Sequence, residues 1–139
     1  MPEIASKTRI YPKGPIFREG DAGDSMYIIQ SGTVEITKNM YGVMVKIAEL
    51  GPGDYFGEMA FLEGAPRSST ALAKTQVEAE VYDHKALACR IASEPEFAFS
   101  MLRAMSHRLR QIDDRLTDLV ARGRLPSQEA SDLGQHSLY

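Results

Sequence analysis

Four residues with complementary chemistry lie close together in the middle of this 139-residue chain: Gly57, Glu58, Arg67 and Ser68. An arginine can donate two hydrogen bonds to one phosphate, and a serine hydroxyl can donate to the same group. A glycine lets backbone approach a ligand closely, and the free amides that begin a helical turn attract an anion. A carboxylate beside a phosphate must instead accept, which suits a sugar hydroxyl. The set predicts a site for a small anionic sugar phosphate.

The segment of residues 56–70 that carries these four residues resembles the phosphate-binding cassette of cyclic-nucleotide-binding domains. That family includes the catabolite activator protein, the regulatory subunits of cyclic-AMP-dependent kinase and cyclic-nucleotide-gated channels. The resemblance implies that the Gly57 amide and Arg67 bind the cyclic phosphate, that Glu58 binds the ribose 2'-hydroxyl, and that Ser68 binds phosphate or base. Its neighbours Met59, Ala60 and Ser69 are included in the expected site. The alternative is a surface loop with a solvated arginine and glutamate.

Composition restricts what the whole chain can be. With 43% hydrophobic residues, 139 residues are enough for one compact domain with a core. The formal charge of −3 gives no general affinity for nucleic acid. The single cysteine, Cys89, excludes an internal disulfide, and no apolar run is long enough to span a membrane. We therefore expect a soluble, cytoplasmic protein without a membrane partner.

The pattern between residues 8 and 83 is one of short strands separated by turns. Val34 and Ile36 alternate with polar residues, which is typical of a half-buried strand, and Val43, Val45 and Ile47 are expected to share one face. A turn is expected at residues 39–42. Many short strands at this spacing predict a mainly β fold, a jelly-roll-like β-barrel that contains the cassette. Ile36 and Ile47 are expected as apolar walls for a purine.

Two helices are predicted after the barrel, within residues 84–122. Asp83 is expected to cap the short one, and residues 93–96 have the form of a capping box for the long one. An apolar heptad seam follows on the long helix, made by Leu102, Met105, Leu109, Ile112, Leu116 and Leu119. This spacing predicts a parallel homodimer through residues 97–122, whereas the alternative is a single amphipathic helix lying on its own barrel. The domain is expected to end near residue 125, with a flexible tail at 126–139.

The resemblance also places three residues of the long helix at the nucleotide. Arg108 matches a family position that approaches the cassette glutamate, here Glu58; the alternative is a solvated arginine. Ile112 and Asp113 match positions near the purine, where the catabolite activator protein has two hydroxyl residues. Ile112 can only cover a base, whereas Asp113 can accept hydrogen bonds from guanine. The alternative for Asp113 is an ordinary surface residue, so both cyclic AMP and cyclic GMP are expected ligands, with no cofactor.

Enzymatic alternatives lack the residues they need. A cupin-like metalloenzyme requires two or three histidines that converge on one metal ion. The three histidines of this chain, at positions 84, 107 and 136, fall at the start of one predicted helix, on the long helix and in the tail. Cys89 has no histidine at a recognisable spacing for nucleophilic catalysis. We therefore expect a non-enzymatic, metal-free sensor that transmits its signal through the long helix, or else a dimerisation module with a degenerate site. Without a helix-turn-helix pattern, DNA is not an expected partner; a protein partner or a missing output domain is.

Overall fold

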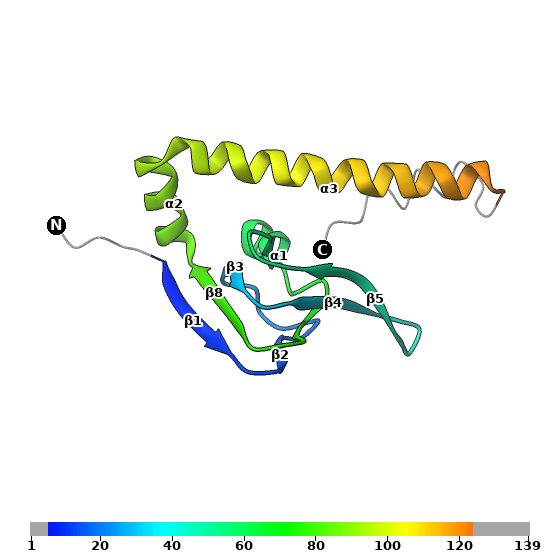
Figure 1. Ribbon diagram of the computed structural model, residues 1–139, viewed down its shortest axis with the longest axis horizontal. Coiled ribbons are helices and arrows are strands. Elements are labelled where there is room, and N and C mark those ends of the chain that lie inside the picture. Colours follow the sequence, from blue (N-terminus) through cyan, green and yellow to red (C-terminus); the bar gives the residue numbers. More distant parts are fainter. Residues whose placement is uncertain (1–5, 124–139) are drawn as a thin grey trace. The chain divides into compact units, whose positions relative to one another are not determined.

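The computed structural model describes residues 6–123 as antiparallel strands followed by helices (Figure 1). This is the predicted mainly β architecture with C-terminal helices. The strands are β1 (Lys7–Tyr11), β2 (Gly14–Phe17), β3 (Met26–Ser31), β4 (Val34–Met40), β5 (Val43–Leu50), β6 (Tyr55–Phe56), β7 (Thr70–Ala73) and β8 (Val77–Tyr82). The helices are α1 (Glu58–Glu63), α2 (His84–Ser93) and α3 (Pro95–Ala121).

The strands form two four-stranded sheets, in the orders β1-β8-β3-β6 and β2-β7-β4-β5. Strand partners are antiparallel and often distant in sequence: β1 pairs with β8, with Lys7 opposite Val81 and Tyr11 opposite Val77. The two strands that flank the cassette belong to different sheets, because β6 pairs with β3 and β7 pairs with β2 and β4. The cassette is therefore the connection from one sheet to the other in a jelly-roll-like fold.

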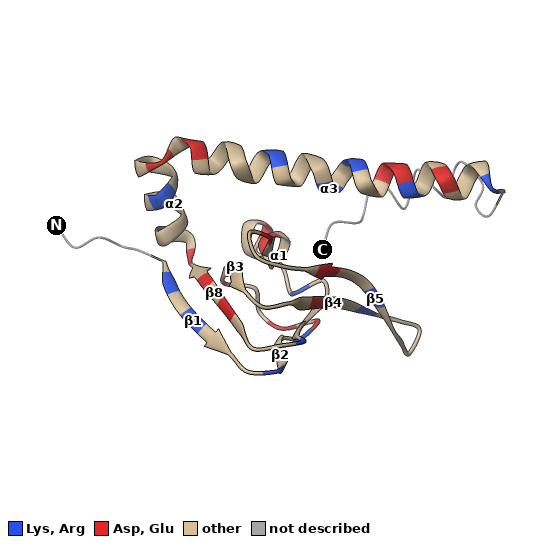
Figure 2. Cartoon of the chain, viewed as in Figure 1, with Lys and Arg blue, Asp and Glu red and all other residues tan. Residues whose placement is uncertain are grey.

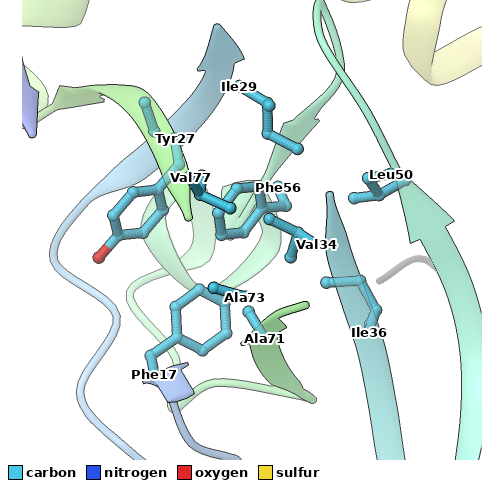
Figure 3. Close-up of a cluster of buried hydrophobic side chains, with 11 residues drawn as sticks. Phe17, Tyr27, Ile29, Val34, Ile36, Leu50, Phe56, Ala71, Ala73 and Val77 are labelled. Atoms are coloured by element: carbon cyan, nitrogen blue, oxygen red, sulfur yellow. The ribbon is translucent and has the colours of Figure 1, made fainter. Parts of the chain in front are cut away.

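The core of the barrel takes side chains from both sheets (Figure 3). Its aromatic part is formed by Phe17, Tyr27 and Phe56, in which the Tyr27 and Phe56 rings stack with centroids 4.8 Å apart. Aromatic pairs of this kind add to the stabilisation that burial itself provides. The buried members of the core cluster are Phe17, Tyr27, Ile29, Val34, Ile36, Leu50, Phe56, Ala71, Ala73, Val77 and Ala79. The alternating residues of β4 are thus buried as the sequence predicted.

The β4–β5 hairpin turns at Tyr41 and Gly42, within the predicted residues 39–42. Both residues have positive φ, 55° and 86°, which matches the two-residue type I′ turn that suits the twist of paired strands. The Asn39 side chain supports the turn, because its Oδ1 accepts from the Gly42 amide at 2.7 Å. A short polar signal in the sequence was therefore enough to locate this turn.

The predicted common face of Val43, Val45 and Ile47 is interrupted. A β-bulge between Ile36 and Thr37 leaves Ile47 without an opposite residue on β4, so the period of two breaks there. Val43 and Val45 are exposed, whereas Ile47 packs against the core. The prediction of a single apolar face is wrong for this strand, because an inserted residue shifts the alternation.

Helices α2 and α3 begin at His84 and Pro95, as predicted. The Asp83 side chain caps α2, since its Oδ1 accepts from the Ala86 amide at 2.7 Å. The residue at the cap position of α3 is Glu94, one residue later than the first residue of the predicted capping box at 93–96. Proline disfavours helical backbone in the residue before it, and Pro95 therefore fixes the start of the helix. Gly123, at φ 71°, follows the end of α3 as predicted.

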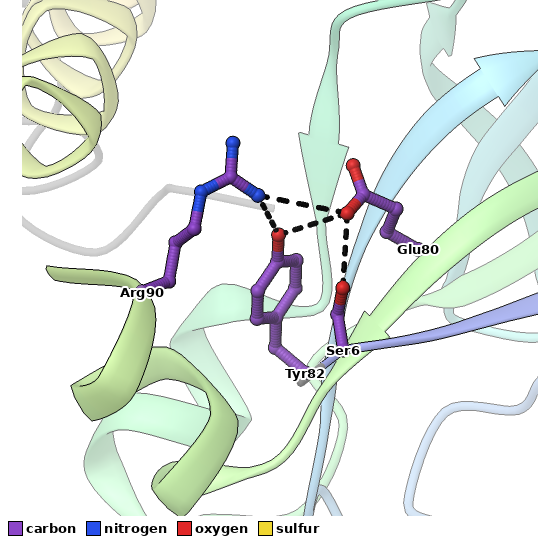
Figure 4. A network of polar contacts seen from close by, with 4 residues as sticks. All are labelled: Ser6, Glu80, Tyr82 and Arg90. Atoms are coloured by element: carbon purple, nitrogen blue, oxygen red, sulfur yellow. Dashed lines mark hydrogen bonds and ion pairs between the residues drawn. The ribbon is translucent and has the colours of Figure 1, made fainter. Parts of the chain in front are cut away.

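A polar network joins Ser6, the residue before β1, to β8 and α2 (Figure 4). Oε2 of Glu80 accepts from the hydroxyls of Ser6 and Tyr82, each at 3.0 Å, and lies 3.6 Å from the Arg90 guanidinium. Arg90 also donates to the Tyr82 hydroxyl. Burial raises the pKa of Glu80, but hydrogen bonds from Gln30, Ser6 and Tyr82 and the charge of Arg90 outweigh it, so the pKa is lowered overall.

The chain divides into two compact units, at Arg90 and Ile91. The first contains the barrel and the cassette, and the second contains α3. Acidic and basic residues are interspersed along the second half of α3 (Figure 2), including an ion pair at 3.2 Å between Asp118 and Arg122. No helix within residues 6–123 is long and apolar enough to cross a membrane. The predicted tail, residues 126–139, lies outside the described residues.

Candidate functional site

The cassette begins with Gly57, which links β6 to α1. Its φ of 78° lies in the left-handed region that glycine adopts without strain. A Cβ at this position would lie 2.8 Å from Nη1 of Arg67 and 3.3 Å from the Phe17 and Tyr27 rings. Both the backbone angle and the close approach of the arginine therefore require glycine here. The Gly57 carbonyl accepts from the Phe61 amide at 3.4 Å, which is the first turn of α1.

The backbone of Arg67 is held by the turn that precedes β3. Its amide donates to the Asp21 carbonyl at 2.8 Å, and its carbonyl accepts from the Gly20 amide at 2.9 Å. Pro66 and Ala22 form an isolated β-bridge beside these bonds. The hydrogen bonds to the Arg67 backbone come from a second segment, some 45 residues earlier in the chain. The position of Arg67 is thus a tertiary feature.

The Arg67 side chain points into the barrel and is only 3% exposed. Nη1 donates to the Gly57 carbonyl and Nη2 to the Ser25 carbonyl, both at 2.8 Å. The guanidinium carbon lies 4.2 Å from the centroid of the Phe17 ring and 5.7 Å from that of Tyr27. Nε is buried and has no hydrogen-bond partner among residues 6–123. A buried donor left without an acceptor costs roughly 1–3 kcal/mol, so this nitrogen is available to an anion.

Glu58, the acidic member of the four cassette residues, directly follows Gly57, whose carbonyl accepts a hydrogen bond from Arg67. Glu58 is the first residue of α1 and is 1% exposed, which is unusual for a carboxylate. Ala60 on the same helix is buried, and Met59 is partly buried. After Arg67, Ser68 is partly buried and Ser69 is buried. The cassette thus gathers an acid, an arginine and the amides at the start of α1 in one connection of the barrel.

Two further expected residues lie in the barrel wall. Ile36 is 1% exposed and belongs to the core cluster, and Ile47 packs against that cluster from β5. Their apolar character is accounted for by the core itself. Contact with a purine remains a prediction for both.

The remaining expected residues, Arg108, Ile112 and Asp113, all lie on α3 and so belong to the second unit. Arg108 is buried, Ile112 is partly buried and Asp113 is exposed. Arg108 and Ile112 are four residues apart and therefore lie on the same side of the helix. The pairing of Arg108 with Glu58 and the contacts of Ile112 and Asp113 with a base stay predictions.

Sequence reasoning missed two partners of Arg67, the Phe17 ring and the Ser25 carbonyl. Phe17 read as an ordinary strand residue, and a backbone carbonyl leaves no signature in the side-chain sequence. The sequence around Phe17 predicts only a short strand followed by a glycine-rich turn near the start of the barrel. Its closeness to residue 67 follows from the pairing of β2 with β7.

Comparison with known proteins agrees with this geometry. The family model described as "Cyclic nucleotide-binding domain" matches residues 8–93. A CRP-like cAMP-activated global transcriptional regulator of Mycobacterium tuberculosis is 38% identical over 112 residues, covering 79% of this chain and 50% of that protein. The cyclic AMP receptor protein of Thermus thermophilus is 35% identical over 115 residues, covering 81% and 53%. The chain spans about half the length of these curated relatives.

A solved structure shows the same fold. The crystal structure of a cyclic nucleotide-binding domain from Methylobacillus flagellatus superimposes with a TM-score of 0.70 at 28% identity, covering 79% of this chain and 65% of that one. The matched residues include all four cassette residues from which the sequence argument started, and the fold that presents them is the one predicted. This chain belongs to the cyclic nucleotide-binding domain family.

Proposed function

We propose that this chain is a sensor that binds cyclic AMP or cyclic GMP and acts by binding, without turnover. The observation that carries the proposal is Arg67, a buried arginine whose Nε has no acceptor among the described residues. A guanidinium has five N–H donors, and only two hydrogen bonds of Arg67 are made to backbone carbonyls. The cyclic phosphate, with one negative charge, supplies the missing acceptor.

Glu58 receives the sugar in this proposal. Glu58 is a buried carboxylate, and a carboxylate accepts hydrogen bonds from donors such as the 2'-hydroxyl of a ribose. The Gly57 amide and the first amides of α1, at Met59 and Ala60, face the phosphate, and Ser68 and Ser69 add hydroxyl donors. The acid selects the sugar, and the arginine selects the phosphate.

The base is read by α3. Ile112 covers the purine, and Asp113 accepts hydrogen bonds from the N1 and N2 donors of guanine. Adenine has no donor at N1, so an aspartate at this position favours cyclic GMP, whereas the two curated relatives described above are named for cyclic AMP. The two ligands are therefore compared directly in the experiment below.

The same helix transmits the signal through a homodimer. Leu102 and Leu109 on its heptad seam are 61% and 49% exposed, which is unfavourable for a monomer and favourable for a second copy. A ligand that binds more tightly when α3 has one of two placements shifts the equilibrium of the dimer toward that placement. The free energy of the shift cannot exceed the difference in binding free energy between the two placements. The effector is a protein partner or an output domain, as the names of the regulators among the relatives suggest.

Isothermal titration calorimetry tests the binding step with cyclic AMP, cyclic GMP and 5'-AMP side by side. We expect saturable binding of one or both cyclic nucleotides and no heat with 5'-AMP. Mass spectrometry of the denatured protein first establishes that no nucleotide was carried through purification. If the empty protein gives no heat with either cyclic nucleotide, the proposal is wrong, and a dimerisation module with a degenerate site takes its place.

A further inference from the structure

The guanidinium of Arg67 lies on an aromatic surface that the binding argument has not used. Its carbon is 4.2 Å from the centroid of the Phe17 ring, well within the range of a cation–π interaction. The Phe17 ring is 8% exposed, so water does not screen the contact. An interaction of this kind is strongest when it is desolvated.

The three contacts of the guanidinium act in different directions. Nη1 and Nη2 donate to the carbonyls of Gly57 and Ser25, whereas the guanidinium carbon lies over the Phe17 ring. Hydrogen bonds alone allow a planar group to tilt about the line that joins them. A ring at 4.2 Å from the guanidinium carbon opposes that tilt. It leaves Nε as a buried donor without an acceptor among residues 6–123.

Phe17 also contacts the other end of the cassette. A Cβ at Gly57 would lie 3.3 Å from Cε2 of Phe17, so the ring packs directly against that glycine. It is joined to the aromatic cluster, with centroid distances of 5.8 Å to Tyr27 and 5.9 Å to Phe56 (Figure 3). The ring is therefore itself held firmly, as a residue that positions another must be.

We propose that Phe17 is a positioning residue for the cyclic nucleotide: its ring fixes the plane of the Arg67 guanidinium so that Nε is directed at the phosphate. This inference rests on the proposed function. It implies that part of the affinity for the ligand comes from preorganisation of Arg67 by a side chain that does not touch the ligand. The competing explanation is that Phe17 serves only to fill the core.

Fluorination of the ring separates the two explanations. Fluorine withdraws electron density, so it makes the electrostatic potential at the ring face less negative with little change in the volume of the ring. Phe17 is replaced by mono-, di- and trifluorinated phenylalanine, and Kd for cyclic AMP and cyclic GMP is measured by calorimetry. Phe56 is the matched control, since it is fully buried in the same cluster, and the cation–π contacts described for Arg67 are with Phe17 and Tyr27. Thermal unfolding of every variant reports effects on packing.

We expect Kd to rise with each fluorine at position 17, by about tenfold in total, and to stay within twofold for the same series at position 56. The variant Phe17→Leu, which keeps an apolar side chain, should lose affinity by a similar factor. The unmodified protein could bind normally while Kd does not change with fluorination at position 17, or changes equally at positions 17 and 56. Either result would overturn the proposed role of Phe17 but leave the proposed function standing. Absence of binding by the unmodified, ligand-free protein would overturn the proposed function and this role together.

Discussion

The barrel and α3 treat their apolar residues in opposite ways. In the barrel, the large apolar side chains of the core cluster are less than 10% exposed and come from strands of both sheets. On α3, Phe99, Leu102 and Leu109 are about half exposed or more, at 60%, 61% and 49%. The barrel encloses its core with its own strands, whereas the seam of α3 has the pattern of a surface that a second chain covers.

In the proposed function, the barrel recognises the ligand and α3 transmits the signal. A closed core holds Arg67 and Glu58 in a fixed, dry environment, where charges and hydrogen bonds act strongly. An exposed helical seam gains stability only from what binds it, and so its position can respond to a ligand. The predictions below test whether the two regions divide the work in this way.

The largest expected effect is on the stability of the barrel. Phe56→Ala removes a ring that is 0% exposed and should lower the free energy of unfolding by about 3–5 kcal/mol. Phe99→Ala makes the same chemical change at a 60% exposed site on α3 and should cost about 0.5 kcal/mol or less. Urea unfolding at one protein concentration compares the two variants. Similar losses in both would contradict the contrast between the two regions.

Loss of the cassette arginine should weaken binding without affecting the dimer. Arg67→Ala removes the cation that is proposed to bind the phosphate, and it should reduce the binding free energy of the cyclic nucleotide by about 2–5 kcal/mol. Calorimetry measures this loss. Arg18→Ala, at an exposed arginine of the neighbouring turn, is the control and should bind normally. An Arg67→Ala protein with unchanged affinity would show that the phosphate is bound elsewhere.

A charged residue in the heptad seam should weaken the dimer. Leu109→Asp places a carboxylate on the proposed dimer interface and should weaken dimerisation by about 2–3 kcal/mol, because the charge loses water on association. Thr117→Asp introduces the same charge at an exposed position off the seam and should leave the dimer intact. Sedimentation equilibrium gives the dissociation constants. A wild-type protein that is monomeric at tens of micromolar would rule out the interface outright.

Base selection should depend on α3 and not on the barrel. Asp113→Ala removes the proposed acceptor for guanine and should cost cyclic GMP about 1–2 kcal/mol of binding free energy, with a smaller effect on cyclic AMP. Asp114→Ala, one residue further along the helix, controls for the loss of negative charge. Equal losses for the two nucleotides in calorimetry would mean that Asp113 does not read the base.

The smallest expected effect concerns the network of Ser6, Glu80, Tyr82 and Arg90. The pKa of Glu80 is lowered from its ordinary value of 4.5, so its stabilisation is present above that pH and is lost as the pH falls through the lower folded value. Glu80→Gln should therefore destabilise the protein by about 0.5 kcal/mol at neutral pH, a small value because solvent screens the partly exposed ion pair, and by less in acid.

Urea unfolding at about pH 6 and about pH 3.5 measures the pH dependence of this effect. Glu78→Gln, on the same strand but outside the network, is the control. If Glu80→Gln had the same effect at both values of pH, the carboxylate charge would not be what stabilises the network.

Local signals in the sequence were sufficient for much of the fold. Asp83 was identified as a helix cap, the turn near Gly42 was located, and the end of α3 at Gly123 was predicted, because each depends on a few adjacent residues. The start of α3 at Pro95 was also predicted, although the residue at the cap position is Glu94 and not Ser93. The shift of face in β5 was missed, because a bulge is set by the partner strand.

The sequence by itself determined the chemistry of the candidate site: a glycine, an acid, an arginine and a serine at the spacing of a cyclic nucleotide cassette. Only the tertiary structure decided how Arg67 is held, with its backbone against the turn at residues 20–22, its guanidinium on the Phe17 ring and its N–H groups on two carbonyls. The reason is physical. Residue types and their spacing persist in any conformation of the chain, whereas contacts such as that between Arg67 and Ser25, 42 positions apart, form only when the sheets pair.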